Sequence, residues 1–275
     1  MNIGIIGTGT HATVRRQAAG EVPGVQHVEV LAGVSEIGIA DASRLDAFLD
    51  GVEVVFVTVP TAAHFRIAEA ATKQGVHVFL EWPPATSIRE CQDVVQLSEE
   101  AGVEVGVSRP LRFHPVFETL PEAWRAALIL LRQEIDETEE AAWPRWLADA
   151  IDLCCTLAQS HSVQRVDAEA VRMSALWPEA VACGLRFHSG SYAQISIRRS
   201  QAGAAHALYA ANGDFDVAAD LLAANDGSAD AYVSSLVAET QAFLHAIIQQ
   251  QPVPVSILDG LHTMRLVERL MEKLR

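Results

Sequence analysis

A glycine-rich turn lies close to the first residue of the chain. A short apolar run at residues 2–6 ends in Gly7, and a helix is predicted over residues 11–19. Between them stands the pattern G-x-G-x-x-A, formed by Gly7, Thr8, Gly9, Thr10, His11 and Ala12. In a strand–turn–helix unit the first glycine permits the tight turn, the second lets the backbone approach a pyrophosphate, and the alanine allows close helix packing. The pattern predicts a dinucleotide site, with a purely structural turn as the alternative.

The segment after the second predicted strand bears on which dinucleotide would bind. Ser35 stands where an acidic residue usually binds the ribose hydroxyls, and Glu36 follows it. A 2′-phosphate would require a nearby arginine, and none adjoins Ser35 in the sequence. We therefore expect NAD or NADP, with a slight preference for NAD. The interval from Ser35 to Glu53 has room for one crossover helix, so the first domain is expected to be shortened here.

The elements that would position this turn alternate between strand and helix. Residues 52–59 are continuous, apolar and β-branched, which is typical of a buried parallel strand. Ser87 and Glu90 form a capping box, so a helix is predicted to begin there and to end at Gly102. Further strands are predicted at residues 28–34, 76–80 and 103–107, and helices at 43–49 and 64–74. This order predicts a parallel, doubly wound α/β sheet.

The pattern changes after about residue 115. Residues 133–140 are acidic and are expected to be irregular, and a helix is predicted around residues 146–158. Strand-like segments with polar and apolar alternation follow at residues 168–174, 181–187, 192–198 and 204–210, and two helices at 232–249 and 258–274. We predict a dinucleotide domain over residues 1–115. An α+β domain with a mostly antiparallel open sheet would cover residues 116–275, its last helices packing back toward the first domain.

The composition limits the classes of partner. Among 275 residues, 35 acidic side chains stand against 20 basic ones, for a net charge of −15. Nucleic acid and anionic membranes are therefore poor partners. No apolar run approaches the ~18 residues of a membrane span and no secretory signal is recognisable, so a cytoplasmic location is expected. The acidic, lysine-poor composition fits either a salt-adapted cytoplasm or a GC-rich genome.

Cysteine and histidine spacing gives no sign of a metal site. Cys154 and Cys155 are adjacent and are interpreted as small apolar residues of a core. His206, His245 and His262 lack the spacing of metal ligands. We therefore expect no bound metal.

Several motifs occur in the order found in one family of oxidoreductases. The glycine turn is followed by Val-Thr-Val-Pro-Thr at residues 57–61 with His64, by Gly-Val-His-Val-Phe-Leu-Glu-Trp-Pro at 75–83, and by Arg-Phe-His-Pro at 112–115. Glu239, Phe243, Pro254, Asp259 and Gly260 continue the series. The chain resembles the glucose–fructose oxidoreductase, inositol dehydrogenase and rhizopine-catabolism (Gfo/Idh/MocA) family, densely over residues 1–115 and thinly after them.

This resemblance implies a fold, an activity and a site. Members have a Rossmann-type dinucleotide domain and an α+β domain whose open sheet often mediates oligomers. Most oxidise or reduce a sugar-type alcohol or carbonyl with a bound nicotinamide, so a small-molecule substrate and a homo-oligomer through the C-terminal sheet are expected. By the same resemblance, the residues near the nicotinamide and its ribose would be Thr58, Pro60, Thr61 and His64. The turn below the reacting ring would be held by Glu81 and Pro83.

The sequence departs from the family at two catalytic positions. The residue between Glu81 and Pro83 is normally a lysine that polarises the substrate oxygen. Here it is Trp82, whose indole exchanges no proton near neutral pH. The family tends to carry a histidine three residues before the aspartate of an Ile-Asp pair, and Asp149 stands at that place before Asp152. The candidates for orienting or deprotonating a substrate are Asp149, Asp152 and Arg112.

These departures leave three functional hypotheses. The chain is an NAD(P)-dependent enzyme that transfers hydride to or from a small carbonyl, alcohol or imine, mainly by positioning. Alternatively it binds the nucleotide without chemistry, as a sensor or subunit, or the nucleotide site has been lost. We adopt the first, because biliverdin reductases also have an aromatic residue in this turn and thiazolinyl imine reductases also lack the lysine. The structural alternatives are a salt bridge for Arg112, solvated acids for Asp149 and Asp152, and a helix cap for His64.

Overall fold

The computed structural model describes residues 1–32, 42–121, 123–135, 143–172, 178–200, 205–222 and 231–274. The chain forms two compact units. The first contains Met1–Pro110 and Leu236–Leu261, and the second contains Leu111–Ser235 and His262–Arg275. The predicted domain limits, at residue 115, stay a prediction.

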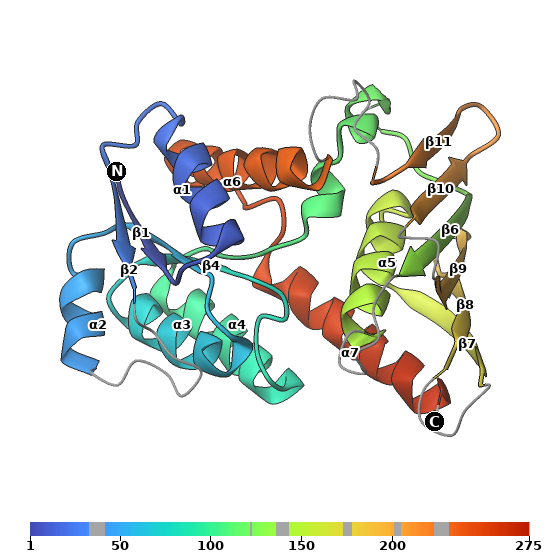
Figure 1. Ribbon diagram of the computed structural model, residues 1–275, viewed down its shortest axis with the longest axis horizontal. Helices are drawn as coiled ribbons and strands as arrows, with labels where there is room; N and C mark the ends of the chain where they lie inside the picture. The colour runs from blue at the N-terminus through green and yellow to red at the C-terminus, as the bar shows by residue number, and fades with distance from the viewer. Residues whose placement is uncertain are drawn as a thin grey trace. The chain divides into compact units, whose positions relative to one another are not determined.

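The first unit is built on a five-stranded parallel sheet, ordered β2-β1-β3-β4-β5. Its strands are β1 (Asn2–Ile6), β2 (His27–Leu31), β3 (Val54–Val57), β4 (His77–Leu80) and β5 (Val105–Val107). Figure 1 shows α1 (Thr10–Gly20) and α6 (Ala231–Gln249) on one face, and α2 (Ala42–Leu49), α3 (His64–Lys73) and α4 (Ile88–Ala101) on the other. The predicted doubly wound parallel sheet is confirmed.

The local signals in the sequence explain these elements. The side chains of Val54–Val57 are fully buried, as expected for an apolar central strand covered by helices on both faces. At the start of α4, the hydroxyl of Ser87 accepts a hydrogen bond from the Glu90 N–H at 3.2 Å. The helix ends at Gly102 in the left-handed conformation. The capping-box prediction is therefore confirmed.

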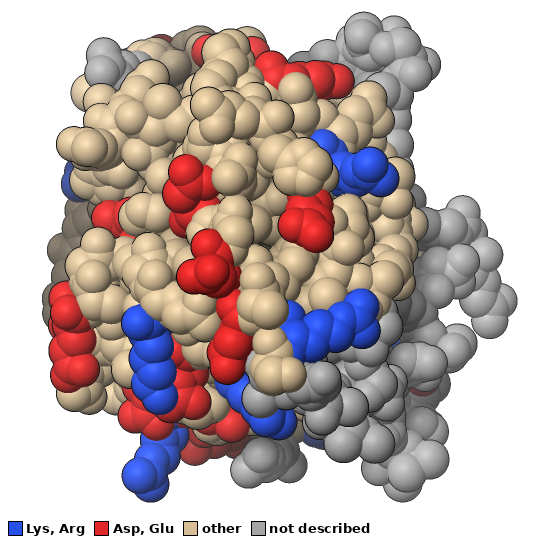
Figure 2. All heavy atoms as spheres, turned by 90° about the vertical axis from the view of Figure 1, so that its left-hand side faces the viewer, with Lys and Arg blue, Asp and Glu red and all other residues tan. Residues whose placement is uncertain are grey.

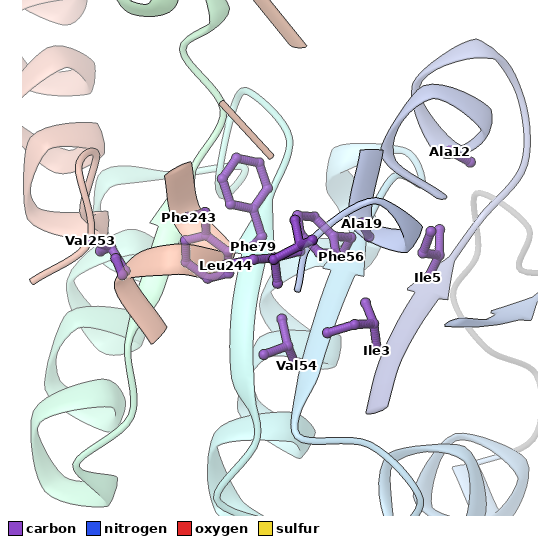
Figure 3. Close-up of a cluster of buried hydrophobic side chains, with 12 residues drawn as sticks. Ile3, Ile5, Ala12, Ala19, Val54, Phe56, Phe79, Phe243, Leu244 and Val253 are labelled. Atoms are coloured by element: carbon purple, nitrogen blue, oxygen red, sulfur yellow. The ribbon is translucent and has the colours of Figure 1, made fainter. Parts of the chain in front are cut away.

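An aromatic cluster forms the centre of this unit. The ring centroids of Phe56 and Phe79 lie 5.2 Å apart, and Phe79 meets Phe243 of α6 edge-on at 4.9 Å. Figure 3 shows these rings beside Ile3 and Val54 of the neighbouring strands. Because Phe243 comes from α6, the core joins residues that are far apart in the sequence.

The second unit contains a six-stranded mixed sheet, ordered β11-β10-β6-β9-β8-β7. Its strands are β6 (Leu128–Ile135), β7 (Val163–Val171), β8 (Ala180–Phe187), β9 (Tyr192–Arg199), β10 (Ala205–Ala211) and β11 (Asp216–Asp220). Only β6 and β9 pair in parallel within this sheet. The helix α5 (Trp143–Leu157) belongs to this unit, as does α7 (Ile257–Leu274) from His262 onward. The predicted mostly antiparallel sheet is confirmed.

Two strands of this sheet were not expected. Residues 133–135 were predicted to be irregular but end β6, and β11 had no counterpart among the predicted strands. Buried and exposed side chains alternate along β6: Ile129, Leu131 and Ile135 are buried, while Leu128 and Leu130 are exposed. The polar residues near the end of the strand make this alternation hard to recognise in the sequence. The strand expected at residues 168–174 begins earlier, at Val163, and ends at Val171.

None of the helices in the described ranges combines the length and apolarity needed to cross a membrane. On the face drawn in Figure 2, acidic and basic side chains of the described residues are interspersed, with no continuous basic patch. The four cysteines, all among the described residues, are buried and form no disulfide bond. Within the described part of the chain, no group of three or more potential ligands could hold a metal ion.

Candidate functional site

The glycine turn connects β1 to α1 in a conformation that requires its glycines. Gly7 has φ +123°, and a Cβ placed on it would lie 2.8 Å from the Thr58 carbonyl oxygen. Gly9 has φ +108°, and nothing lies within 4 Å of its Cβ position. The Gly9 carbonyl accepts hydrogen bonds from the Thr13 N–H at 3.0 Å and from its hydroxyl at 2.9 Å. The backbone is thus fixed at Gly7 and open to a ligand at Gly9.

The start of α1 is suited to a phosphate. Gly9 is the N-cap and supplies no side-chain hydrogen bond to the first amides of the helix. The amides and the dipole of such a helix end attract anions. Ala12 is buried in the core cluster, as its predicted packing role requires. These features of Gly9, α1 and Ala12 fit the pyrophosphate of a dinucleotide.

A buried arginine lies one turn further along α1. The Arg15 side chain is fully buried and donates four hydrogen bonds: Nε to Glu81 at 2.6 Å, one terminal nitrogen to Thr240 at 2.9 Å, and the other to Ser108 and Glu239, both at 2.8 Å. Its guanidinium also lies over the Phe79 ring, 4.4 Å from the centroid. We call Arg15, Glu81, Ser108, Glu239 and Thr240 the Arg15 network. It joins α1 to the ends of β4 and β5 and to α6.

The pKa values of the two carboxylates in this network are shifted in opposite directions. Burial alone would raise the pKa of Glu81, but the charges of Arg15 and His11 outweigh it and lower the pKa to about 2. Burial raises the pKa of Glu239, and the repulsion of Glu81 adds to this although Arg15 opposes it. The difference arises because Glu81 contacts both Arg15 and His11 and keeps some exposure, whereas Glu239 is completely enclosed. Glu81 is therefore an ionised, structural carboxylate at neutral pH.

His11 connects this network to the glycine turn. Its Nδ1 lies 3.0 Å from Glu81 Oε2, and 34% of its side chain is exposed. Since Glu81 is held by Arg15 on its other oxygen, the position of the imidazole is determined by the network. The predicted role of His11 in the dinucleotide turn stays a prediction. Its contact with Glu81 links that turn to the Arg15 network.

His64 holds two turns of the first unit together. Its Nε2 lies 2.8 Å from the Val59 carbonyl and its Nδ1 2.9 Å from the Pro83 carbonyl. The ring is almost completely buried, and burial lowers its pKa, so it is neutral at neutral pH. Each ring nitrogen faces a main-chain carbonyl, and the single N–H of the neutral ring donates to one of them. His64 therefore ties the end of β3 to the turn that contains Trp82.

The remaining predicted cofactor residues follow β3 and β4. Thr58 donates to the Ile6 carbonyl through its N–H at 2.9 Å and its hydroxyl at 3.1 Å, which joins it to the end of β1. Pro60 is exposed and Thr61 is half-buried in the turn that precedes α3. Pro83 is half-buried beside Trp82. Ser35 lies outside the described residues.

Trp82 packs against an arginine. The guanidinium carbon of Arg109 lies 3.4 Å from the centroid of the Trp82 ring, which is contact distance. Arg109 is 2% exposed, whereas Trp82 is half-buried. Trp82 follows β4 and Arg109 follows β5, so the stack lies at the carboxyl ends of two neighbouring strands. Ligands of open α/β sheets bind beyond these ends.

In the second unit the structure brings Arg112 and Asp152 together. Arg112 donates from Nε at 2.8 Å and from a terminal nitrogen at 2.7 Å, and each bond goes to a different oxygen of Asp152. Thr263 lies 3.4 Å from the same carboxylate. Asp149 lies one turn earlier on α5 and is half-buried. Arg112 and Asp152 thus form the salt bridge considered as the structural alternative for Arg112, and this pair orients both side chains.

Sequence reasoning did not find the Arg15 network. Arg15 shares the buried face of α1 with Ala12, Ala18 and Ala19, and a single arginine on an otherwise small apolar face was the available signal. Its partners at residues 81, 108, 239 and 240 are distant in sequence, so no local pattern could have grouped them.

A family model for oxidoreductases with an NAD-binding Rossmann fold, GFO_IDH_MocA, matches residues 1–109. Over these residues, the chain matches the Gfo/Idh/MocA oxidoreductase family. The expected family resemblance is therefore confirmed. The family's NAD-binding character agrees with the open glycine turn at Gly9.

Curated relatives match parts of the chain. The UDP-N-acetylglucosamine 3-dehydrogenase of Acidithiobacillus ferrooxidans is 29% identical over 129 residues, which cover 45% of this chain and 41% of the relative. The D-xylose 1-dehydrogenase (NADP(+)) 2 of Haloferax volcanii is 33% identical over 90 residues, or 32% of this chain and 28% of the relative. The matched segments therefore span less than half of these relatives.

Solved structures show the fold over nearly the whole chain. The Acidithiobacillus ferrooxidans enzyme superposes with a TM-score of 0.82 at 19% identity, covering 100% of this chain and 97% of that one. The Lactobacillus casei scyllo-inositol dehydrogenase, solved with NAD(H) and scyllo-inositol, gives 0.76 at 15% identity, covering 100% and 96%. GenD2 from gentamicin A biosynthesis, solved with NAD, gives 0.80 at 16% identity, covering 99% and 93%. At these identities the likeness shows the fold alone.

Proposed function

We propose that the chain is an NAD(P)-dependent oxidoreductase that transfers hydride to or from a small carbonyl, alcohol or imine. The observation that carries this proposal is the glycine turn: Gly9 is open, and α1 begins without a side-chain cap, within a domain that matches an NAD-binding family. A bound nicotinamide would supply or accept the hydride. The chain's own residues would hold it and orient the substrate.

The proposed division of roles follows from the chemistry of each residue. The backbone of residues 7–12 would hold the pyrophosphate, and Thr58, Pro60 and Thr61 would lie near the nicotinamide ribose. Glu81 remains ionised because its pKa is about 2, so it is a positioning residue and not a proton donor. Trp82 exchanges no proton and would shape the pocket. Asp149, which stands where the family has a histidine, is the proposed acceptor for a substrate proton.

The test is a titration with NADH and NADPH, followed by energy transfer from tryptophan to nicotinamide at low and at molar salt. Micromolar binding that is lost in Gly9→Val supports the proposal, because a side chain would fill the open position. Gly213→Val is the matched control, since Gly213 has φ +97° and an open Cβ position but belongs to the second unit. Absence of binding by the wild-type protein at both salt concentrations would refute the proposal.

The second candidate is a nucleotide-binding homologue without catalysis. The observation that favours it is Trp82, together with an aspartate at position 149 where the family has histidine. A screen of carbonyl, alcohol and imine substrates with the preferred nucleotide discriminates between the two. Binding without turnover, and activity gained only in Trp82→Lys, would favour the second candidate.

We also propose that NAD is the preferred nucleotide and that the outer face of the six-stranded sheet pairs with a second copy of the chain. Leu130 of β6 and Tyr209 of β10 are directly opposite each other on this face and are 38% and 37% exposed. Leu128 extends the apolar strip. Light scattering of the wild type and of Leu130→Arg tests the pairing: a wild-type monomer, or an unchanged mass in the variant, would contradict it.

A further inference from the structure

The carboxyl end of β2 lies against the glycine turn. The Gly7 N–H donates to the Leu31 carbonyl at 3.0 Å, and Leu31 is the last residue of β2. In a dinucleotide fold of this kind the pyrophosphate lies at the glycine turn, and the adenosine ribose lies beside the end of the second strand. A group held at Ala32, the next residue, would therefore lie close to the ribose of a bound dinucleotide.

An arginine from a later helix reaches this point. Arg44, in the first turn of α2, donates a hydrogen bond from a terminal nitrogen to the Ala32 carbonyl at 3.2 Å. Its side chain is exposed, so a ligand can reach the guanidinium. The sequence shows no arginine next to Ser35, but the fold brings Arg44 to the end of β2.

The chemistry of a guanidinium fits the phosphate that distinguishes NADP from NAD. Arginine keeps its charge at any pH at which a protein is folded, and its planar fork of N–H groups matches the oxygens of a phosphate. The bond to Ala32 uses one of these N–H groups and anchors the guanidinium before a ligand arrives. At the same position NAD carries a neutral hydroxyl group, which gains much less from a cation.

We infer that Arg44 binds the 2′-phosphate of NADP(H), so that the site accepts both nucleotides and the proposed preference for NAD is small. This inference rests on the proposed function and adds to it a residue that determines nucleotide specificity. The net charge of −15 disfavours a ligand with an additional phosphate, which is consistent with the preference for NAD. Arg44 offsets this penalty at the place where the additional phosphate would lie.

The test compares the dissociation constants of NADPH and NADH, measured at low salt by energy transfer from tryptophan to nicotinamide. We expect the wild type to bind NADPH at most about ten-fold more weakly than NADH. In Arg44→Gln this ratio should rise about five-fold or more, because NADPH loses a charge-assisted contact and NADH does not. Arg44→Lys keeps the charge without the planar fork, and its ratio should lie between the two.

Arg66→Gln is the matched control. Arg66 is exposed on α3, which lies on the same face of the sheet as α2, so this variant changes the net charge equally. Its ratio of dissociation constants should stay within about two-fold of wild type. Molar salt should weaken NADPH binding more than NADH binding in the wild type, and should reduce the difference between the wild type and Arg44→Gln.

Adenosine fragments test the contact without the nicotinamide. Adenosine 2′,5′-bisphosphate and adenosine 5′-monophosphate differ only in the 2′-phosphate, and each can displace bound NADH. In Arg44→Gln the bisphosphate should bind about five-fold more weakly, and the monophosphate should bind as it does to the wild type. A general disturbance of the turn would instead weaken both fragments and would overturn the assignment.

The outcomes separate this inference from the proposed function. If the wild type binds NADH but not NADPH, or if the ratio in Arg44→Gln stays within about two-fold of wild type, the role of Arg44 is wrong and the proposed function stands. An equal change in Arg66→Gln, or equal losses of NADH and NADPH binding in Arg44→Gln, would also overturn it. If the wild type binds neither nucleotide, the proposed function fails and this inference fails with it.

Discussion

Replacing Arg15 by methionine should lower the free energy of unfolding by about 3 kcal/mol or more. Methionine is long enough to fill most of the buried space, so the expected loss comes from the charge and not from a cavity. The substitution removes four hydrogen bonds and leaves Glu81 and Glu239 enclosed without their cation. Removing one partner of a buried ion pair typically costs 3–5 kcal/mol.

The titration of Glu81 gives an independent magnitude. Its pKa is about 2 in the folded protein against an ordinary 4.5. At 1.36 kcal/mol per pH unit, this difference corresponds to about 3 kcal/mol. Because the folded pKa is lowered, this stability is fully present above pH 4.5 and is lost as the pH falls toward 2. The raised pKa of Glu239 offsets part of it at neutral pH, which places the expectation at the lower end of the range.

Urea denaturation at pH 7, followed by circular dichroism, measures the effect as a shift of the midpoint at constant slope. Arg16→Met is the matched control, because Arg16 is the next residue on α1 and is exposed. Combining Arg15→Met with Glu239→Gln should recover about 1 kcal/mol or more, since one unpaired charge is removed. A loss below about 1 kcal/mol in Arg15→Met, or a loss no larger than in Arg16→Met, would refute the reasoning.

Two further predictions concern stability. Burial lowers the pKa of His206 to about 4 despite the nearby Asp220, so stability should fall as the pH drops from 6.5 toward 4. At pH 4.5 this loss should reach about 2 kcal/mol and should be absent in His206→Leu, as measured by urea denaturation at pH 7 and pH 4.5. Gly7→Ala should lower stability by about 2 kcal/mol, because alanine disfavours φ +123° and its Cβ would meet the Thr58 carbonyl. Thermal unfolding of both variants measures this: Gly20→Ala, at an open position, should show no such loss of stability. Equal losses in Gly7→Ala and Gly20→Ala would contradict the argument.

The fold of the first unit was predictable because its signals are local. The apolar run at Val54–Val57, the capping box at Ser87 and Glu90, and the glycine turn each lie within a few residues of sequence. The second unit was less accessible for the same reason. The end of β6 carries Arg132, Gln133 and Glu134, so its identity as a strand depends on the neighbours β9 and β10 and not on its own composition.

The sequence predicted which residues belong to the candidate site but not how their side chains contact one another. Sequence reasoning placed Glu81 and Trp82 in one turn and named Arg112, Asp149 and Asp152 as candidates for orienting or deprotonating a substrate. It could not show that Arg109 stacks on Trp82 or that Arg112 pairs with Asp152. These contacts depend on which strand ends are neighbours and on which side chains face inward. Both properties follow from long-range packing.

Burying an ion cluster carries a large desolvation penalty, and well-packed apolar side chains often stabilise a fold as well or better. Apolar contacts, however, are not directional, so they do not hold a side chain in one orientation as hydrogen bonds do. Arg15 donates one hydrogen bond to Glu81, which directly precedes Trp82. It donates two more to Ser108 and Glu239, and Ser108 directly precedes Arg109. The cluster also reaches the glycine turn through His11. An apolar substitute could preserve stability but would leave Trp82 and His11 free to turn, so the retained function of these charges is geometric.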